Sequence, residues 1–170
     1  MKELRPLTTR EEARELLKKV TLTRQAVMAR IAEVFHPIGL LEPIKLQLKL
    51  HLAKLNGKDW KETLTIEELE FWVEKLVEFV DLPEIRVPRC IIPAGFSKQD
   101  IRLVCFADSA NDAGGAAIYA GVEITPGVYS SALVATKSRL MKGTVPRNEL
   151  SAIMLMAELA FVVKRPQVQK

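Results

Sequence analysis

The chain has 170 residues, enough for one domain or two small ones, and this length excludes a large multidomain enzyme. A hydrophobic share of 48% and a charged share of 27% are those of a globular protein and exclude a disordered or collagen-like chain. Lys and Arg number 25 against 21 Asp and Glu, and the resulting net charge of +4 favours polyanionic partners only weakly.

The cysteines and the N-terminal residues indicate the cellular location of the protein. Cys90 and Cys105 form one disulfide at most, and we expect both to be small buried strand residues. The first thirty residues lack the apolar run of a secretory signal. The apolar stretch 150–163 is interrupted by Glu158 and is shorter than the ~20 residues of a bilayer span, so it predicts a buried helix. We therefore expect an intracellular protein, organellar (mitochondrial) or cytoplasmic, that is neither secreted nor membrane-bound.

The beginning of the chain has the composition and the caps of helices. Threonine, then acidic residues, then lysines follow one another over about 9–19, which predicts a short first helix. Thr23 opens a second helix over 24–35. Residues 36–43 contain two prolines and a glycine, so we expect a turn there.

Residues 44–55 alternate between apolar and polar side chains, which is the period of a strand. Leu, Lys, Gln and Ala dominate this segment, and because they are good helix formers we interpret it as a third helix that Gly57 stops. Thr65 and Glu68 form a capping box for a fourth helix, which Pro83 ends.

The second half changes to strand-forming residues separated by Pro, Gly and Asp. Strands are expected at 84–92, 101–107, 115–122 and 128–138. Residues 101–107 are almost wholly apolar, which is typical of a central strand covered on both faces. A closing helix follows Pro146, with one apolar side made of Leu150, Ile153, Met154, Ala157 and Phe161.

These elements predict an α+β fold in two domains. A helical, bundle-like part covers residues 1–83. An antiparallel sheet of three to four strands with one packed helix covers residues 84–170.

This arrangement of elements makes two carboxylate residues candidate metal ligands. Asp108 comes directly after the strand at 101–107, and Glu149 lies in the first turn of the closing helix. A carboxylate at a strand end that faces one at a helix start is able to bind a divalent hard cation. The alternative to metal binding is a purely structural role, in which Asp108 ends a strand and the negative charge of Glu149 stabilises the N-terminus of a helix.

Three motifs of the second half resemble the ribonuclease H region of BEL/Pao-type retrotransposon polyproteins. They are FADSANDAGGAAIY at 106–119, ATKSR at 135–139 and VPRNEL at 145–150. Upstream, residues 31–43 and 85–90 resemble the helical thumb and connection segments of the same polyproteins. The resemblance spans about residues 20–165, nearly the whole chain.

The resemblance implies a ribonuclease H sheet in which Asp108 and Glu149 match metal-binding positions. It also implies further aspartates on a fourth strand and a later helix, with a second metal ion. Since the sequence stops at Lys170, we expect that strand and helix to be absent and Asp108 and Glu149 to be vestigial. We therefore expect the chain to be catalytically inactive and to bind no cofactor. Mg²⁺ is expected only if the chain is a nuclease.

The same resemblance bears on partners. Without the fourth strand, the strand at 101–107 is left at the edge of the sheet, where unpaired N–H and C=O groups invite association. We therefore expect other protein subunits, or another copy of the chain, to cover this edge.

Basic residues are the candidates for contact with RNA. Lys137, Arg139, Lys142 and Arg147 form a run without an acidic residue, and Lys45 and Lys49 lie on the third expected helix with Lys54 and Lys58 near its end. The alternative for both groups is a solvated surface. His36 and His51 lack the spacing of a zinc site. Trp60, Phe71 and Trp72 are expected to be core or interface anchors.

Our first hypothesis is a non-catalytic, retroelement-derived subunit of a larger assembly, for example a ribonucleoprotein such as an organellar ribosome. The second is a metal-dependent ribonuclease H fragment of a retrotransposon polyprotein. The third is an RNA-binding module without catalysis, whose affinity falls steeply as salt rises.

Overall fold

The computed structural model describes residues 11–12, 14–15, 19, 21–34, 36, 38–78, 82, 85–87, 90, 93–97 and 100–164. The chain forms two compact units, one from residues 1–35 and 51–86 and the other from residues 36–50 and 87–170. Helices precede an antiparallel sheet along the chain, so the predicted α+β class is confirmed. The predicted domain boundary at residue 83 stays a prediction.

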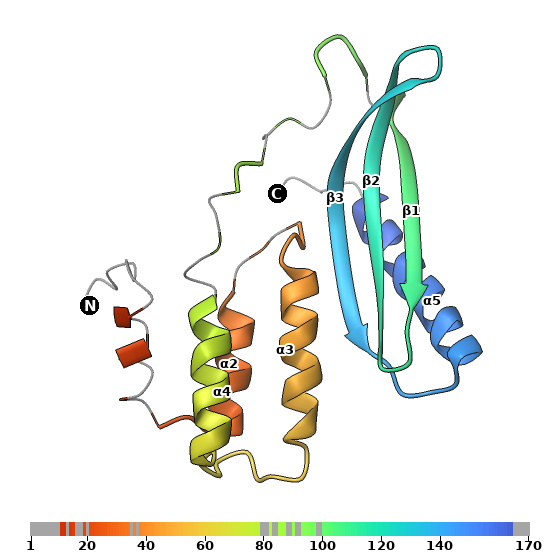
Figure 1. Ribbon diagram of the computed structural model, residues 1–170. Coiled ribbons are helices and arrows are strands. Elements are labelled where there is room, and N and C mark those ends of the chain that lie inside the picture. The colour runs from red at the N-terminus through yellow and green to blue at the C-terminus, as the bar shows by residue number, and fades with distance from the viewer. Residues whose placement is uncertain are drawn as a thin grey trace, which may run out of the picture. The chain divides into compact units, whose positions relative to one another are not determined.

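The first unit contains α2 (Arg24–Glu33), α4 (Ile66–Val77) and the last residues of α3 (Glu42–Lys54) (Figure 1). The Thr23 hydroxyl accepts a hydrogen bond from the Ala26 amide, and Thr65 and Glu68 form the predicted capping box. The Leu64 amide donates to the Leu22 carbonyl at 3.0 Å, which joins the segments ahead of α2 and α4. Among the residues that the structure describes in this unit, the buried ones are Leu22, Val27, Ile31, Leu55, Trp72, Val73 and Val77.

The expected helices are confirmed where the structure describes them. The segment that alternates like a strand is the helix α3, as the helix-forming composition predicts. Of the expected first helix, the described residues 11, 12, 14 and 15 are helical and Lys19 is in a turn, and the rest lies outside the described residues. Trp72 is buried, whereas Trp60 is 46% exposed and lies under the Arg24 guanidinium, 4.1 Å from the ring centroid.

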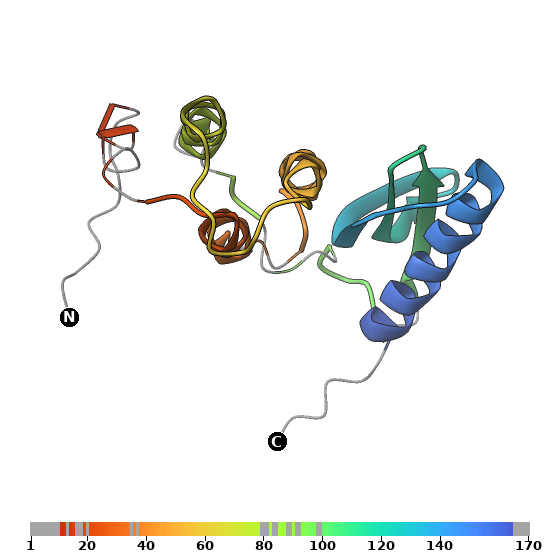
Figure 2. The ribbon, with the colours of Figure 1, turned by 90° about the horizontal axis from the view of Figure 1, so that it is seen from below.

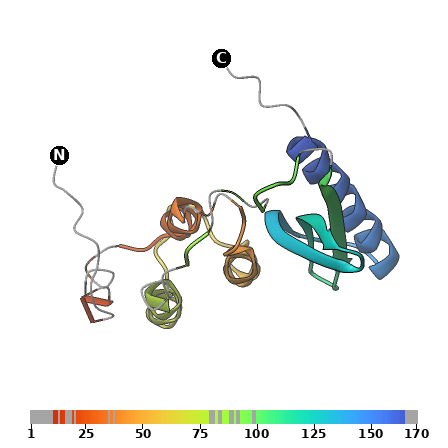
Figure 3. The same cartoon turned by 90° about the horizontal axis from the view of Figure 1, so that it is seen from above.

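The second unit contains a three-stranded antiparallel sheet in the order β1 (Arg102–Ser109), β2 (Ala113–Thr125) and β3 (Val128–Leu140). The helix α5 (Val145–Lys164) contacts all three strands and lies along one face of the sheet (Figures 2 and 3). Alternate β2 residues are buried, from Gly114 to Val122, and the buried α5 residues Ala152 and Leu155 supply the other side of this core. No described helix is both long and apolar enough to span a membrane.

Three expectations for the second half are wrong. The described residues 85–87 and 90 are not in a strand, because the prolines of this segment remove ladder N–H groups, and Cys90 is exposed. β1 is not covered on both faces as a central strand, which its composition suggested: among the described residues it lies at the sheet edge, as the resemblance implied, and its residues alternate between exposed and half-buried. The apolar side of α5 is not buried either, since Leu150, Ile153, Met154 and Phe161 are all more than half exposed.

Residues 36–50 attach to the sheet through β3. The Thr136 amide donates to the Ile38 carbonyl at 3.0 Å, and the Thr136 hydroxyl donates to the Gly39 carbonyl at 2.6 Å. Gly39 has a φ of 82°, and a Cβ added there lies 2.5 Å from the Thr136 carbonyl oxygen. Both the backbone conformation and the close approach therefore require glycine at this position.

We predict that Gly39→Ala lowers the free energy of unfolding of the second unit by about 2–4 kcal/mol, because it adds a clash with Thr136 to the strain of a positive φ. The matched control is Gly127→Ala. Gly127 has a φ of 80°, but nothing lies within 4 Å of an added Cβ, so only the strain of about 1 kcal/mol applies. Chemical denaturation measures both losses, and equal losses contradict the proposed close contact.

Candidate functional site

Backbone hydrogen bonds hold the turn after β1 against the exit from β3, which leads into α5. The Ala110 amide donates to the Ala113 carbonyl at 2.7 Å and closes the turn between β1 and β2. The Met141 amide donates to the Asp112 carbonyl at 2.8 Å and ties this turn to the exit from β3. The turn after β1 and the loop before α5 therefore lie at the same end of the sheet.

The side chain of Asn148 holds the start of α5 at the end of the sheet where β1 ends. Among the described residues, Asn148 is the one polar residue that is buried, with 2% of its surface exposed. Its side-chain amide donates to the Asn111 carbonyl at 2.8 Å and approaches the carbonyls of Ala110 and Gly143 at 3.4 and 3.5 Å. Asn148 directly precedes Glu149, so these bonds fix the first turn of α5 relative to the end of β1. The sequence analysis missed Asn148; its spacing of four and seven residues from Ala152 and Leu155, which puts an amide on the same side of the helix as two apolar residues, was the available signal.

Asp108 and Glu149 both lie on the β1 side of the sheet, but Asp108 shares the sheet face away from α5, on which Glu149 lies. Asp108 is exposed near the end of β1, opposite Gly115 of β2, and its carboxylate accepts a hydrogen bond from the Ser109 amide at 2.8 Å. Glu158 of α5 approaches Arg139 of β3 at 3.6 Å, so it marks the β3 side of the helix. Glu149 precedes Glu158 by nine residues, about two and a half turns, and therefore points to the opposite, β1 side.

The two carboxylates have the chemistry of a partial ligand set for a divalent cation. Both are exposed, and neither forms an ion pair with another described residue. Carboxylate oxygens are the ligands that Mg²⁺ prefers, with waters or substrate phosphates completing the coordination. The described residues contain no group of three or more His, Cys, Asp or Glu side chains that are arranged to hold a metal ion.

The candidate RNA-binding residues differ in what surrounds them. Lys137, Lys142 and Arg147 are exposed, on β3, in the loop after it and in the first turn of α5. Arg139 faces Glu158, so part of its charge is already compensated. Lys49 is engaged by Glu42 and Ser138, and Lys45 also has interaction partners. A role of these residues in RNA binding stays a prediction.

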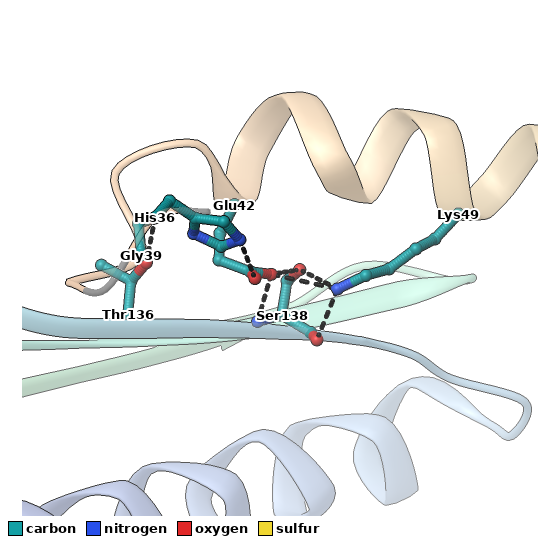
Figure 4. Close-up of polar contacts among 6 residues, drawn as sticks. All are labelled: His36, Gly39, Glu42, Lys49, Thr136 and Ser138. Atoms are coloured by element: carbon teal, nitrogen blue, oxygen red, sulfur yellow. Dashed lines mark hydrogen bonds and ion pairs between the residues drawn. The ribbon is translucent and has the colours of Figure 1, made fainter. Parts of the chain in front are cut away.

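A polar cluster that the sequence analysis did not find joins the start of α3 to β3 (Figure 4). The Ser138 hydroxyl and amide both donate to the Glu42 carboxylate, the amide at 3.0 Å. Lys49 donates to the same carboxylate oxygen at 3.1 Å, and His36 approaches the other oxygen at 3.6 Å. Because Glu42 and Lys49 lie on α3 and Ser138 lies on β3, these bonds hold the start of α3 against β3.

The environment of this cluster shifts two pKa values. Partial burial acts to raise the pKa of Glu42, but the hydrogen bonds from Ser138 and Lys49 and the Lys49 charge outweigh it and hold that pKa below its usual value. Burial lowers the pKa of His36, the positive charge of Lys45 lowers it further, and the nearby Glu42 only partly opposes these effects.

Next to the cluster, a pocket of about 720 Å³ opens on the face of the sheet opposite α5. Leu40, Pro43 and Leu46 form one wall of it. Phe106 and Tyr119, which meet edge to face at a centroid distance of 5.9 Å, also line it. The walls are therefore mainly apolar, and Asp108 lies among the lining residues.

An antiparallel three-stranded sheet, a helix packed on it and a carboxylate on each of β1 and α5 define a partial ribonuclease H-like fold. The model of the Pao retrotransposon-like RNaseH-like domain family matches residues 23–168. The chain belongs to this family, and the resemblance to BEL/Pao-type polyproteins is confirmed. A search of curated proteins finds no match to the chain.

We predict that Glu42→Gln destabilises the second unit by about 1–2 kcal/mol at pH 7, because the hydrogen bonds to the ionised carboxylate weaken. A carboxylate with a lowered pKa adds stability that is fully present above its ordinary pKa and is lost as the pH falls through the lowered one. The difference between the two proteins should therefore shrink in acid. Denaturation across a pH series measures it, with exposed Glu70→Gln as the control, and a difference that stays constant with pH contradicts the assignment.

We also predict that Asn148→Ala lowers the free energy of unfolding by about 1–3 kcal/mol, because it leaves buried carbonyl groups without a donor. Ser151→Ala is the matched control on the same helix, since the Ser151 hydroxyl only bonds the Arg147 carbonyl at an exposed position. Thermal or chemical denaturation measures both variants. A loss no larger than that of the control contradicts the fastening role of Asn148.

Proposed function

We propose that this ribonuclease H-like domain carries the first two carboxylates of a divalent-metal site, Asp108 and Glu149, and takes part in cutting the RNA strand of RNA–DNA hybrids. The observation that supports the proposal is the hydrogen bonding of Asn148, which holds the start of α5 at the same end of the sheet as the end of β1, although Asp108 shares the sheet face away from α5. Membership of the retrotransposon family supports the choice of substrate.

The residues present fit a metal ion as part of its ligand set. Asp108 and Glu149 would hold a divalent cation such as Mg²⁺, which when bound would activate water and stabilise charge on a phosphate. Lys142 and Arg147, exposed at the same end of the unit, are suited to contact substrate phosphates. Since two carboxylates leave most positions of the ion to other ligands, we propose that cleavage requires further carboxylates from outside the described residues.

A non-catalytic role as a subunit of a larger assembly is the second candidate. The observation that favours it is the edge position of β1, which pairs only with β2 among the described residues and exposes Val104 and Phe106. Such an edge is suited to pairing with another polypeptide. In this case Asp108 and Glu149 have no catalytic part, and metal binding is not required.

The metal proposal is tested by adding Mn²⁺ to the isotope-labelled chain and recording its amide NMR spectrum. We predict that the paramagnetic ion broadens resonances of residues 108–112 and 143–149 first. Asp108→Asn or Glu149→Gln should weaken this effect by about tenfold or more, as expected for loss of a metal ligand. The exposed Asp59→Asn should leave it unchanged.

A hybrid-cleavage assay then separates the two candidates. Without a third carboxylate we expect the chain to bind Mn²⁺ but not to cut a labelled RNA–DNA hybrid in Mg²⁺ or Mn²⁺. Cleavage that Asp108→Asn abolishes would show that the ligand set is complete and would overturn the need for further carboxylates. Absence of Mn²⁺ broadening at these residues would overturn the metal site and favour the non-catalytic role.

A further inference from the structure

The outer edge of β3 lies on the side of the sheet opposite β1. The sheet has the order β1-β2-β3, so a strand added beside β1 would leave this edge as it is. Part of the edge is already paired, because the Thr136 amide donates to the Ile38 carbonyl and the Ser138 amide donates to the Glu42 carboxylate. No described residue makes a backbone hydrogen bond to the outer edge over residues 128–134, which we call the open part of β3.

Three residues of the open part direct their backbone groups outward. The Ala110 amide bonds to the Ala113 carbonyl, and this pair shares the register of β1 with β2. Bonded and non-bonded pairs alternate in an antiparallel ladder, so Tyr119 and Gly121 bond to β1 and not to β3. The β3 residues opposite them, and the residue two places before, therefore direct N–H and C=O away from β2. These residues are Tyr129, Ser131 and Leu133.

The open part of β3 is uncharged. No charged residue occurs from 124 to 136, although 27% of the chain is charged. Edge strands of natural proteins are commonly protected by lysine, proline or an inward-pointing charge, and residues 128–134 contain none of these. Val128 and Tyr129, at the start of the strand, are 55% and 52% exposed. A strand edge of this kind is suited to pairing with another β-strand.

We propose that the open part of β3 is an interface with a second copy of this chain, in which two β3 strands pair antiparallel around a two-fold axis at Ser131. Ser131 then lies opposite Ser131 of the second copy, and Tyr129 lies opposite Leu133 of the second copy. Each residue that directs its backbone groups outward meets another that does so, which completes the hydrogen bonds of the ladder. Each copy supplies both members of the tyrosine–leucine pair, as a two-fold interface requires.

The two ends of the open part select this register. A turn limits it on one side and the attached segment ahead of α3 limits it on the other, and Ser131 lies at its midpoint. A shift by two residues in one direction places Leu133 opposite Gly127, which is in the turn. A shift in the other direction places Tyr129 opposite Ala135, whose backbone groups face β2 because those of the next residue face outward. Either shift therefore loses hydrogen bonds at both ends of the ladder.

The side chains and the helix leave room for this pairing. A two-fold axis perpendicular to the sheet keeps α5 of both copies on the same face of one continuous sheet. On that face Ser130 lies opposite Ala132 of the second copy, and both side chains are small. α5 contacts β3 less extensively than it contacts β1 and β2, so the helix does not cover the β3 edge.

This interface does not depend on the proposed nuclease function. Asp108 and Glu149 lie on the β1 side of the sheet, at the opposite edge, so pairing of the two β3 strands leaves both carboxylates accessible. Pairing is measured by the mass of the chain, and metal binding is measured by Mn²⁺ broadening. Failure of one proposal is therefore visible without reference to the other.

Sedimentation equilibrium of the full chain tests the interface. We expect a mass of twice 19.1 kDa that falls on dilution. Ser131→Asp and Ser131→Lys should each weaken association by roughly tenfold or more, because each sets two like charges opposite one another at the two-fold axis. A mixture of the two variants should restore the dimer, since opposite charges then face one another. Thr144→Asp adds a negative charge at an exposed position directly ahead of α5 and should leave the mass unchanged.

Cross-linking tests the register directly. Opposed residues of a hydrogen-bonded pair have Cα atoms about 5.5 Å apart, within the range of a disulfide. In a chain that carries Cys90→Ser and Cys105→Ser, mild oxidation of Ser131→Cys should therefore give a linked dimer. Ser130→Cys is the matched control and should give none, because the two copies of residue 130 are diagonal neighbours about 7–8 Å apart.

The cross-linking result decides the matter even if a charged variant fails to fold. A chain that stays a monomer at all concentrations overturns the proposal. So does a dimer that neither links through residue 131 nor responds to the charged variants.

Discussion

The close packing of α5 on β2 is the constraint on which the second unit depends. The inward positions of β2 are mostly glycine and alanine, from Gly114 to Ala120, with Ile118 as the one large side chain among them. Small side chains on the strand allow the helix to approach, and α5 meets them with Ala152 and Leu155. The helix is then fixed in rotation, and this fixes which flank carries Glu149 and which carries Glu158.

Several parts of this fold could be predicted from the sequence because local signals determine them. Thr65 and Glu68 define a helix start by their own hydrogen bonds, and the glycine and proline punctuation separates β1, β2 and β3. The helix α3 was identified against a strand-like alternation because propensity favoured it. Asp108 and Glu149 as metal ligands stay a prediction, which rests on a strand end, a helix start and the family resemblance.

Tertiary contacts determine what the sequence did not reveal. The contact of Glu42 with Ser138 joins residues that are 96 positions apart, and no local pattern marks such a pair. The apolar residues of α5 suggested a buried side, yet the small residues of β2 turn the helix so that Ala152 faces inward and Leu150 faces outward. Similarly, the apolar composition of β1 indicated a strand covered on both faces, and its position at the sheet edge could not be read from composition alone.

The aromatic residues of the two units have a practical consequence. Both tryptophans, Trp60 and Trp72, belong to the first unit, whereas both tyrosines, Tyr119 and Tyr129, belong to the second. Tryptophan emission therefore reports on the helical unit alone, whereas near-ultraviolet circular dichroism contains bands of both residue types and follows both units. A difference between the two melting curves therefore shows which unit melts first, without any label.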